Sequence, residues 1–314
     1  MWRSWNRDDT MKKMTELLIG GMMIGGLGGA DPLIASQDSE ARAELAAKIA
    51  DEQARAISLI FRKPEGKEKP WYMPNFTWSD VNVNYLDWTS GTVDRGGGAY
   101  KDFWYLELEG GAGWDWGDFY FFTDWENPDK DFDADDAPDD SRWVIKPILD
   151  INIPGTEGVM KNVQIHIQDY YLYGDSFLVN NLVVGLAYKY MSENFFARPF
   201  VGVHYMHDTF HDSLWNGYMG GWVFNYDFRA FDQKFSISNW HEFEWKRDES
   251  TYLNDDGSRQ EFGDRSSWGV QGALAAWWHV TKHVTGGIQY RYSWHKLGNY
   301  NYLNGIIYTL KYNF

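Results

Sequence analysis

The chain of 314 residues contains no cysteine, so no disulfide constrains its fold. This absence does not decide the compartment, because an exported protein with a closed, fully hydrogen-bonded sheet needs no covalent crosslink. After its first 35 residues the chain also lacks any apolar run of the roughly 18 residues that a transmembrane helix requires, and its mean hydropathy is negative. Any membrane crossing must therefore use strands, whose alternate residues face lipid and lumen.

Basic residues are scarce relative to acidic ones: 29 Lys and Arg against 45 Asp and Glu give a net charge of −16. This balance argues against a nucleic-acid partner, whose phosphates favour Lys and Arg. Aromatic residues are abundant, with 18 Trp, 20 Tyr and 19 Phe. Membrane barrels concentrate such rings in girdles at both interfaces, so the composition favours a membrane surface.

Residues 1–35 have the pattern of a signal peptide. Lys12 and Lys13 precede an apolar, glycine-rich run at 17–27, and the small residues near Ala30 suit cleavage. Met11 is a better start than Met1, because it places the basic pair at the front of a signal of normal length. A short buried helix is the alternative.

Residues 36–77 are expected to form a periplasmic helix and a linker. The segment 39–62 is rich in Ala and Glu with its apolar residues near one face, and prolines and a glycine at 64–70 end the pattern. This helix either docks under the barrel, binds a partner, or is a solvated spacer.

Residues 78–314 alternate between apolar and polar side chains over twelve segments of about ten residues. This periodicity predicts an all-β fold, a single closed antiparallel transmembrane β-barrel of about 12 strands, and an even number places both chain ends on the periplasmic side. A soluble sandwich also alternates, but it does not normally point rings such as Tyr188, Trp222 and Trp278 outward. The predicted strands are 78–88, 102–112, 116–126, 141–151, 161–172, 177–190, 196–208, 215–228, 233–246, 266–279, 283–296 and 300–314.

The connections between these segments alternate between long and short, as in outer-membrane barrels with long external loops and tight periplasmic turns. The exception is the short turn at Gly174 and Asp175 between the fifth and sixth strands. At the C-terminus, Tyr308, Leu310 and Tyr312 share one face with Phe314. This ending resembles the signal by which the barrel-assembly machinery recognises its substrates, so we expect the protein to lie in the outer membrane of a Gram-negative bacterium, in contact with lipid and lipopolysaccharide.

The polar face of each predicted strand should line the lumen, which would then be both polar and aromatic. Such a surface suits a small neutral solute with a flat ring, because the ring stacks on Tyr or Phe while carboxylates and amides bind its hydroxyl and amino groups. The alternative is that these charges pair across the lumen and fill it. The candidate substrate-binding residues are Asn82, Asn84, Glu107, Glu109, Asp118, Tyr120, Phe122, Asp124, Arg142, Lys146, His166 and Gln168.

The run Tyr105-Leu106-Glu107-Leu108-Glu109, with the Asp118-Phe119-Tyr120 and Asp124 that follow it, resembles the early hairpin of the Tsx-like nucleoside-specific channels. The closing Tyr312-Asn313-Phe314 is also similar. The resemblance implies a twelve-stranded monomeric barrel through whose narrow lumen nucleosides diffuse, and it carries over to Glu107, Glu109, Asp118, Tyr120 and Asp124. The helix at 39–62 and the absence of a Ser-Phe-Gly-Pro-like stretch between the fourth and fifth strands depart from the family pattern, so the exact solute stays open.

Three other groups of residues are candidates for metal binding or catalysis. The aspartates of 129–140 lack the glycine and the bidentate glutamate of a calcium loop, and His204, His207 and His211 do not have a known metal spacing. A lipid hydrolase would need Ser213 and His211 together at the membrane-facing rim. We therefore predict a passive channel that is not an enzyme and has neither metal nor cofactor, with a surface receptor or structural anchor as the alternative and a lipid hydrolase as the third.

Overall fold

A computed structural model describes residues 69–132, 140–175, 177–209, 211, 213–254, 256–260, 263–264 and 266–314. Residues from Pro74 onward form one compact unit. No helix in the described ranges is long and apolar enough to cross a membrane. The predicted signal peptide and the helix at 39–62 lie outside the described residues.

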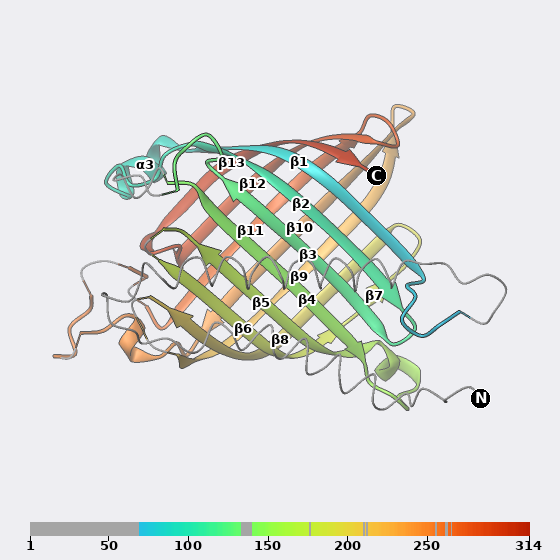
Figure 1. The fold of residues 1–314 in the computed structure, drawn as a ribbon, viewed down its shortest axis with the longest axis horizontal. Coiled ribbons are helices and arrows are strands. Elements are labelled where there is room, and N and C mark those ends of the chain that lie inside the picture. The colour runs from blue at the N-terminus through green and yellow to red at the C-terminus, as the bar shows by residue number, and fades with distance from the viewer. Residues whose placement is uncertain are drawn as a thin grey trace, which may run out of the picture. The chain divides into compact units, whose positions relative to one another are not determined.

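The strands form one antiparallel sheet that closes on itself (Figure 1). Consecutive strands are neighbours, and the sheet closes where β1 pairs with β13, as in Val83 opposite Leu310. The strands are β1 (Phe76–Trp88), β2 (Phe103–Trp114), β3 (Gly117–Glu126), β4 (Arg142–Asn152), β5 (Val163–Tyr173), β6 (Leu178–Tyr188), β7 (Tyr190–Met191), β8 (Phe195–Asp208), β9 (Leu214–Ala230), β10 (Gln233–Trp245), β11 (Trp268–His279), β12 (Val284–Lys296) and β13 (Asn299–Asn313).

Twelve long strands build the wall, which confirms the predicted closed barrel. The two-residue β7 only continues the β6 edge along β8, because β6 itself pairs with β8 from Val179 to Ala187. Each predicted segment coincides with one long strand to within two or three residues at either end. The alternation of side chains was sufficient here because it has the same period as the pleat of a strand.

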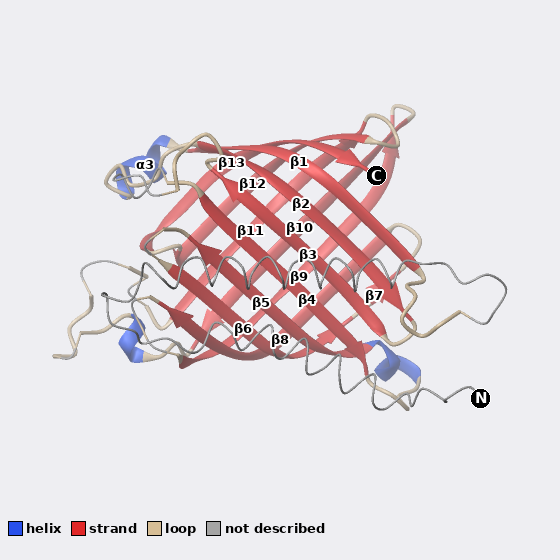
Figure 2. Ribbon diagram, viewed as in Figure 1, coloured by secondary structure: helices blue, strands red, loops and turns tan. Residues whose placement is uncertain are grey.

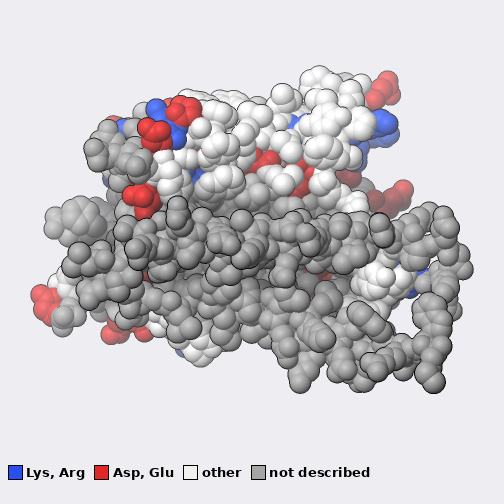
Figure 3. All heavy atoms as spheres, in the orientation of Figure 1, with Lys and Arg blue, Asp and Glu red and all other residues white. Residues whose placement is uncertain are grey.

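The outer face of the wall carries the aromatic girdles expected of a membrane barrel. Exposed rings lie near both ends of the strands, while aliphatic side chains such as Val83, Leu108, Leu186 and Ile288 are exposed between them. In Figure 3 the visible part of the described surface is mostly uncharged between its two ends, where Lys, Arg, Asp and Glu gather. The four C-terminal residues predicted to share a face, 308, 310, 312 and 314, are all exposed on this outer side.

The connections follow the predicted alternation less closely than the strands do. Turns at 115–116 and 231–232 are tight, as predicted for the periplasmic end. The connection between β4 and β5 is longer and contains a 3-10 helix, η2 (Gly158–Asn162), and β5 begins at Val163, two residues after the start of the predicted strand. The external connection between β12 and β13 is a tight hairpin at 297–298, in which Leu297 and Gly298 have positive φ angles.

The first external loop contains a short helix that the sequence analysis missed, α3 (Ser90–Arg95), visible at the barrel end in Figure 2. Thr92 is fully buried; its hydroxyl donates to the Asn304 carbonyl oxygen and accepts from the Asn304 N–H, both at 2.8 Å. The Tyr100 hydroxyl donates to the Leu297 carbonyl oxygen at 2.8 Å. Burial raises the pKa of Tyr100 to about 12, so this hydroxyl keeps its proton at neutral pH. A second 3-10 helix, η3 (Glu249–Thr251), lies in the loop between β10 and β11.

Candidate functional site: the barrel lumen

The strand register places all twelve candidate residues on the inward face. Asn82 and Asn84 are opposite Glu107 and Tyr105, and the alternation continues around the sheet through each of the first five strands. The structure divides these residues into two groups. One group lies beside an accessible acidic wall, and the other belongs to ion pairs and hydrogen bonds that cross between strands.

The acidic wall is formed by β2 and β3, where Glu107 and Asp124 face one another directly across the strand pair. Asn82 donates a short hydrogen bond to Glu107. Neither carboxylate forms an ion pair with a residue in the described ranges, and one oxygen of Asp124 is buried without a hydrogen-bond partner there. Two neighbouring carboxylates without a cation form a strong hydrogen-bond acceptor for a solute with donor groups.

Three aromatic rings follow the same wall. Trp78 lies 5.9 Å from Tyr120, and Tyr120 lies 6.3 Å from Phe122, measured between ring centroids. The Tyr120 hydroxyl donates to Glu109 at 2.9 Å, so its ring is held beside the carboxylates. Trp78 was not among the predicted luminal residues, although it shares the side-chain parity of Asn82 on β1. The rings form a stacking surface along the acidic wall.

Glu109 differs from Glu107 because it has a cation. Lys311 on β13 donates to Glu109 and lies 3.3 Å from Asp80 on β1. The Lys311 ammonium also lies 5.1 Å from the centroid of the Trp277 ring. Asn84 accepts from the Thr309 hydroxyl at 2.6 Å and is almost fully buried, so it stabilises the β1–β13 closure.

The periplasmic half of the lumen contains a second network. Arg198 on β8 donates to Asp150 at 2.6 Å and to Asp118 at 3.3 Å, and Lys189 donates to Asp118 at 2.7 Å. His166 hydrogen-bonds Asp150 at 2.7 Å, and its ring stacks on Phe200 at 4.5 Å. Asp118 and Asp150 are already bound to cations, and His166 is hydrogen-bonded to Asp150. Asp118 and His166 therefore stabilise the wall of the lumen.

A third network joins opposite walls. Lys146 on β4 forms an ion pair with Glu242 on β10, and Gln168 and Gln271 donate to the same carboxylate at 2.8 and 2.9 Å. Toward the external end, Arg142 pairs with Glu126 on the neighbouring strand at 2.7 Å. The alternative that charges pair across the lumen therefore holds for Lys146 and Asp118, whereas Arg142 pairs along the wall, and Glu107 and Asp124 have no ionic partner among the described residues.

Two large luminal residues were missed by the sequence analysis. Trp240 points into the lumen, and the Arg291 guanidinium lies 4.6 Å from the centroid of its ring. Arg291 donates to Gln271 and to two backbone carbonyl oxygens, and it forms no ion pair with a carboxylate in the described ranges. Side-chain parity would have found Trp240, since it shares a face with Ser238 and Glu242.

The histidine and serine groups do not assemble as the sequence suggested. His204 is buried in the lumen and bonds Asn181 at 2.8 Å, whereas His211 bonds Asp208 in the external loop. Ser213 lies 3.2 Å from His207 rather than beside His211. Among the described residues no group of His, Asp or Glu is arranged to hold a metal ion.

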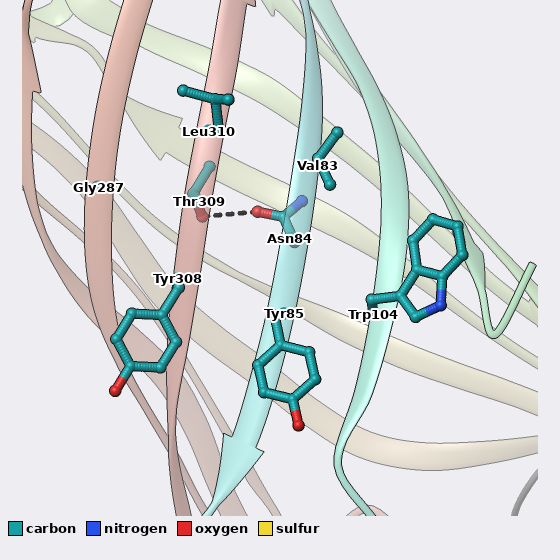
Figure 4. A pocket seen from close by; sticks show the side chains of 8 residues that line it. All are labelled: Val83, Asn84, Tyr85, Trp104, Gly287, Tyr308, Thr309 and Leu310. Atoms are coloured by element: carbon teal, nitrogen blue, oxygen red, sulfur yellow. Dashed lines mark hydrogen bonds between the residues drawn. The ribbon is translucent and has the colours of Figure 1, made fainter.

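A hollow of about 420 Å³ lies on the outer face of β13, β1 and β2 (Figure 4). Tyr85 and Tyr308 lie side by side along it, and their hydroxyls point the same way. Its exposed side chains are those of the membrane-facing girdle, and Asn84 and Thr309 bond to each other behind them. The hollow therefore belongs to the lipid-facing surface and not to the lumen. Its lining residues are Val83, Asn84, Tyr85, Trp104, Gly287, Tyr308, Thr309 and Leu310.

The family comparison identifies this barrel. The sequence profile described as "Nucleoside-specific channel-forming protein, Tsx" matches residues 83–314. The chain belongs to this family. The protein is therefore an outer-membrane channel, as its barrel predicted.

Solved outer-membrane barrels are also similar to this Tsx-family chain. The NanC porin has a TM-score of 0.40 and 11% identity, covering 74% of this chain and 98% of the porin. A channel from Pseudomonas putida F1 has a TM-score of 0.39 and 11% identity, covering 80% and 99%. Outer membrane phospholipase A from Escherichia coli has a TM-score of 0.36 and 12% identity, covering 76% and 96%.

Proposed function

We propose that this channel lets nucleosides diffuse passively across the outer membrane. The observation that carries the proposal is that Glu107 and Asp124, which have no ionic partner among the described residues, lie on neighbouring strands with luminal rings close by. A nucleoside has a flat base that stacks on aromatic rings, and hydroxyl and amino groups that donate to carboxylates. The description of the family names the same class of solute.

The proposed mechanism is weak, repeated binding. The solute slides along Trp78, Tyr120 and Phe122 while its hydroxyls exchange water for the carboxylates of the acidic wall. Each contact must be weak enough to release the solute, because a channel conducts only when entry and exit are both easy. A neutral solute suits this lumen, because most of the other luminal charges already have a partner. The charge of an ionic solute would therefore find no counter-charge there.

The test is block of single-channel current by adenosine and by thymidine in planar bilayers. We expect nucleosides to interrupt the current of the wild type, and Glu107→Ala to weaken this block by about tenfold or more, since a hydrogen bond to a charged group contributes about 1.5–3 kcal/mol. Asp124→Asn should act in the same direction. Uptake of nucleosides into liposomes should fall in parallel.

Asp227→Asn is the matched control, because Asp227 is a more exposed carboxylate near the periplasmic turn, paired with Lys234 at 3.2 Å and away from the acidic wall. Nucleosides should block the current of this variant as strongly as that of the wild type. A wild-type channel whose current is indifferent to nucleosides would refute the proposed solute. Equal block in the wild type and in Glu107→Ala would remove the role assigned to the acidic wall.

A further inference from the structure

Among the described residues, the ion pair between Lys146 and Glu242 joins nearly opposite walls of the lumen. Lys146 lies on β4 and Glu242 on β10. In the closed sheet these strands are separated on one side by β5, β6, β8 and β9, and on the other by β3, β2, β1, β13, β12 and β11. A contact between them must therefore pass through the interior of the barrel.

The contact is fixed at both ends. Glu242 accepts from Lys146 and Gln168 on one oxygen and from Gln271 on the other, so side chains from three other strands converge on its carboxylate. The Lys146 ammonium also lies 5.8 Å from the centroid of the Trp240 ring. A buried ion pair is stable when its remaining hydrogen-bonding capacity is satisfied, as it is here for both carboxylate oxygens.

The two sides of this ion pair differ in packing. On the side of β5 to β9, the large luminal side chains of Gln164, His166, Val183 and His204 have at most 2% of their surface exposed. On the side of β1 to β3, Asn82 and Asn84 are also fully buried, but the luminal side chains Glu107, Tyr120, Phe122 and Asp124 remain partly accessible. The ion pair thus lies between the partly accessible acidic wall and the buried cluster of Gln164, His166, Val183 and His204.

We propose that Lys146 and Glu242 form a crossbar that confines permeating solutes to the side of the lumen lined by the acidic wall. The crossbar acts as an internal partition of the channel and sets the largest solute that can pass. It also keeps a solute within reach of Glu107 and the aromatic rings, instead of letting it cross the lumen at a distance from them. This inference concerns the shape of the passage and does not depend on which solute the channel carries.

The double variant Lys146→Ala/Glu242→Ala tests the proposal, because it removes both side chains and leaves the net luminal charge unchanged. Unitary conductance and the exclusion limit for polyethylene glycols of graded size are measured in planar bilayers. We expect a roughly twofold rise in conductance and a higher exclusion limit, since flow through a pore follows its open cross-section. The charge-swapped variant Lys146→Glu/Glu242→Lys rebuilds a crossbar and should restore wild-type values.

The matched control is Lys234→Ala/Asp227→Ala. This pair is also of opposite charge, but it joins the neighbouring strands β9 and β10 and does not cross the lumen. It should leave conductance and exclusion limit at wild-type values. Wild-type values in the crossbar double variant, or an equal rise in the control, would overturn the proposal. Neither outcome depends on nucleoside block, so the fate of the proposed solute is decided separately.

Discussion

Trp240 is held inside the lumen by two cations, with Arg291 close to its ring and Lys146 farther away. A cation near an indole ring is attracted by the ring quadrupole, which contributes about 0.5–1 kcal/mol at accessible sites. The ring is only partly buried, so part of its surface remains open to the passage. This position suits a second stacking contact for a solute that has entered along Tyr120 and Phe122.

We expect Trp240→Leu to weaken nucleoside block at least about fivefold, because stacking of one base on an aromatic side chain contributes ~1–3 kcal/mol. Trp278→Leu is the control, since Trp278 is exposed on the outer face, 47% accessible, on the neighbouring strand β11. Both variants are compared in the same current-block measurement. Block that is unchanged in Trp240→Leu, or equally weakened in Trp278→Leu, would contradict a stacking role.

At the scale of single residues, the sequence predicted which side chains face the lumen but not which residues they contact. A strand alternates strictly, so the inward position of Glu107, Lys146 and His166 followed from parity alone. Their contacts did not follow, because Lys146 meets a residue 96 positions away and Asp118 meets Arg198 80 positions away. Such distances in the chain are set by the closure of the whole barrel. The alternation of side chains along one strand carries no information about which strands face each other across the barrel.

Arg247 fixes the long external loop between β10 and β11. Its side chain is 2% exposed, and it contacts Glu244 at 2.6 Å and Asp264 at 3.2 Å. It also donates to the carbonyl oxygen of His295 at 2.8 Å, near the end of β12. One buried guanidinium thus joins the ends of two strands to the loop that connects β10 with β11.

We expect Arg247→Gln to lower the free energy of unfolding by about 3–5 kcal/mol, because removal of one partner of a buried ion pair leaves the other without compensation. Lys246→Gln makes the same change in charge at the exposed neighbouring residue and should be nearly neutral. Urea-induced unfolding of the barrel in lipid vesicles measures both. A loss of equal size in the two variants would show that the change in net charge, and not the buried contact, is responsible.

The strands were predicted more accurately than the helix and the connections. Strands were found to within two or three residues because each contains its own periodic signal. The helix α3 was missed, since its six residues include a glycine and its burial depends on Asn304 of the last strand, more than 200 positions away. The bounds of the β4–β5 connection were predicted to within two residues, but its 3-10 helix η2 was not predicted.

At the scale of the whole molecule, the closed sheet encloses a lumen in which most charges of the described residues are paired. Lys311, Arg198 and Lys146 each bind a carboxylate on another strand. The charges without an ionic partner among the described residues are chiefly Glu107 and Asp124, against Arg291. The unpaired groups thus have a net negative charge, in a chain whose overall charge is −16.

We therefore expect the channel to prefer cations over anions, since carboxylates in a narrow, low-dielectric passage focus a field that repels anions. The zero-current potential in a KCl gradient should have the sign of potassium selectivity. It should grow as the salt is diluted, because the screening length rises from ~3 Å at 1 M to ~30 Å at 0.01 M. The double variant Glu107→Gln/Asp124→Asn should abolish the potassium selectivity and shift the potential toward that of chloride, because Arg291 would remain without an ionic partner among the described residues, whereas Asp227→Asn at the more exposed mouth should change it little. Chloride selectivity in the wild type would instead mean that Arg291 dominates the field of the passage.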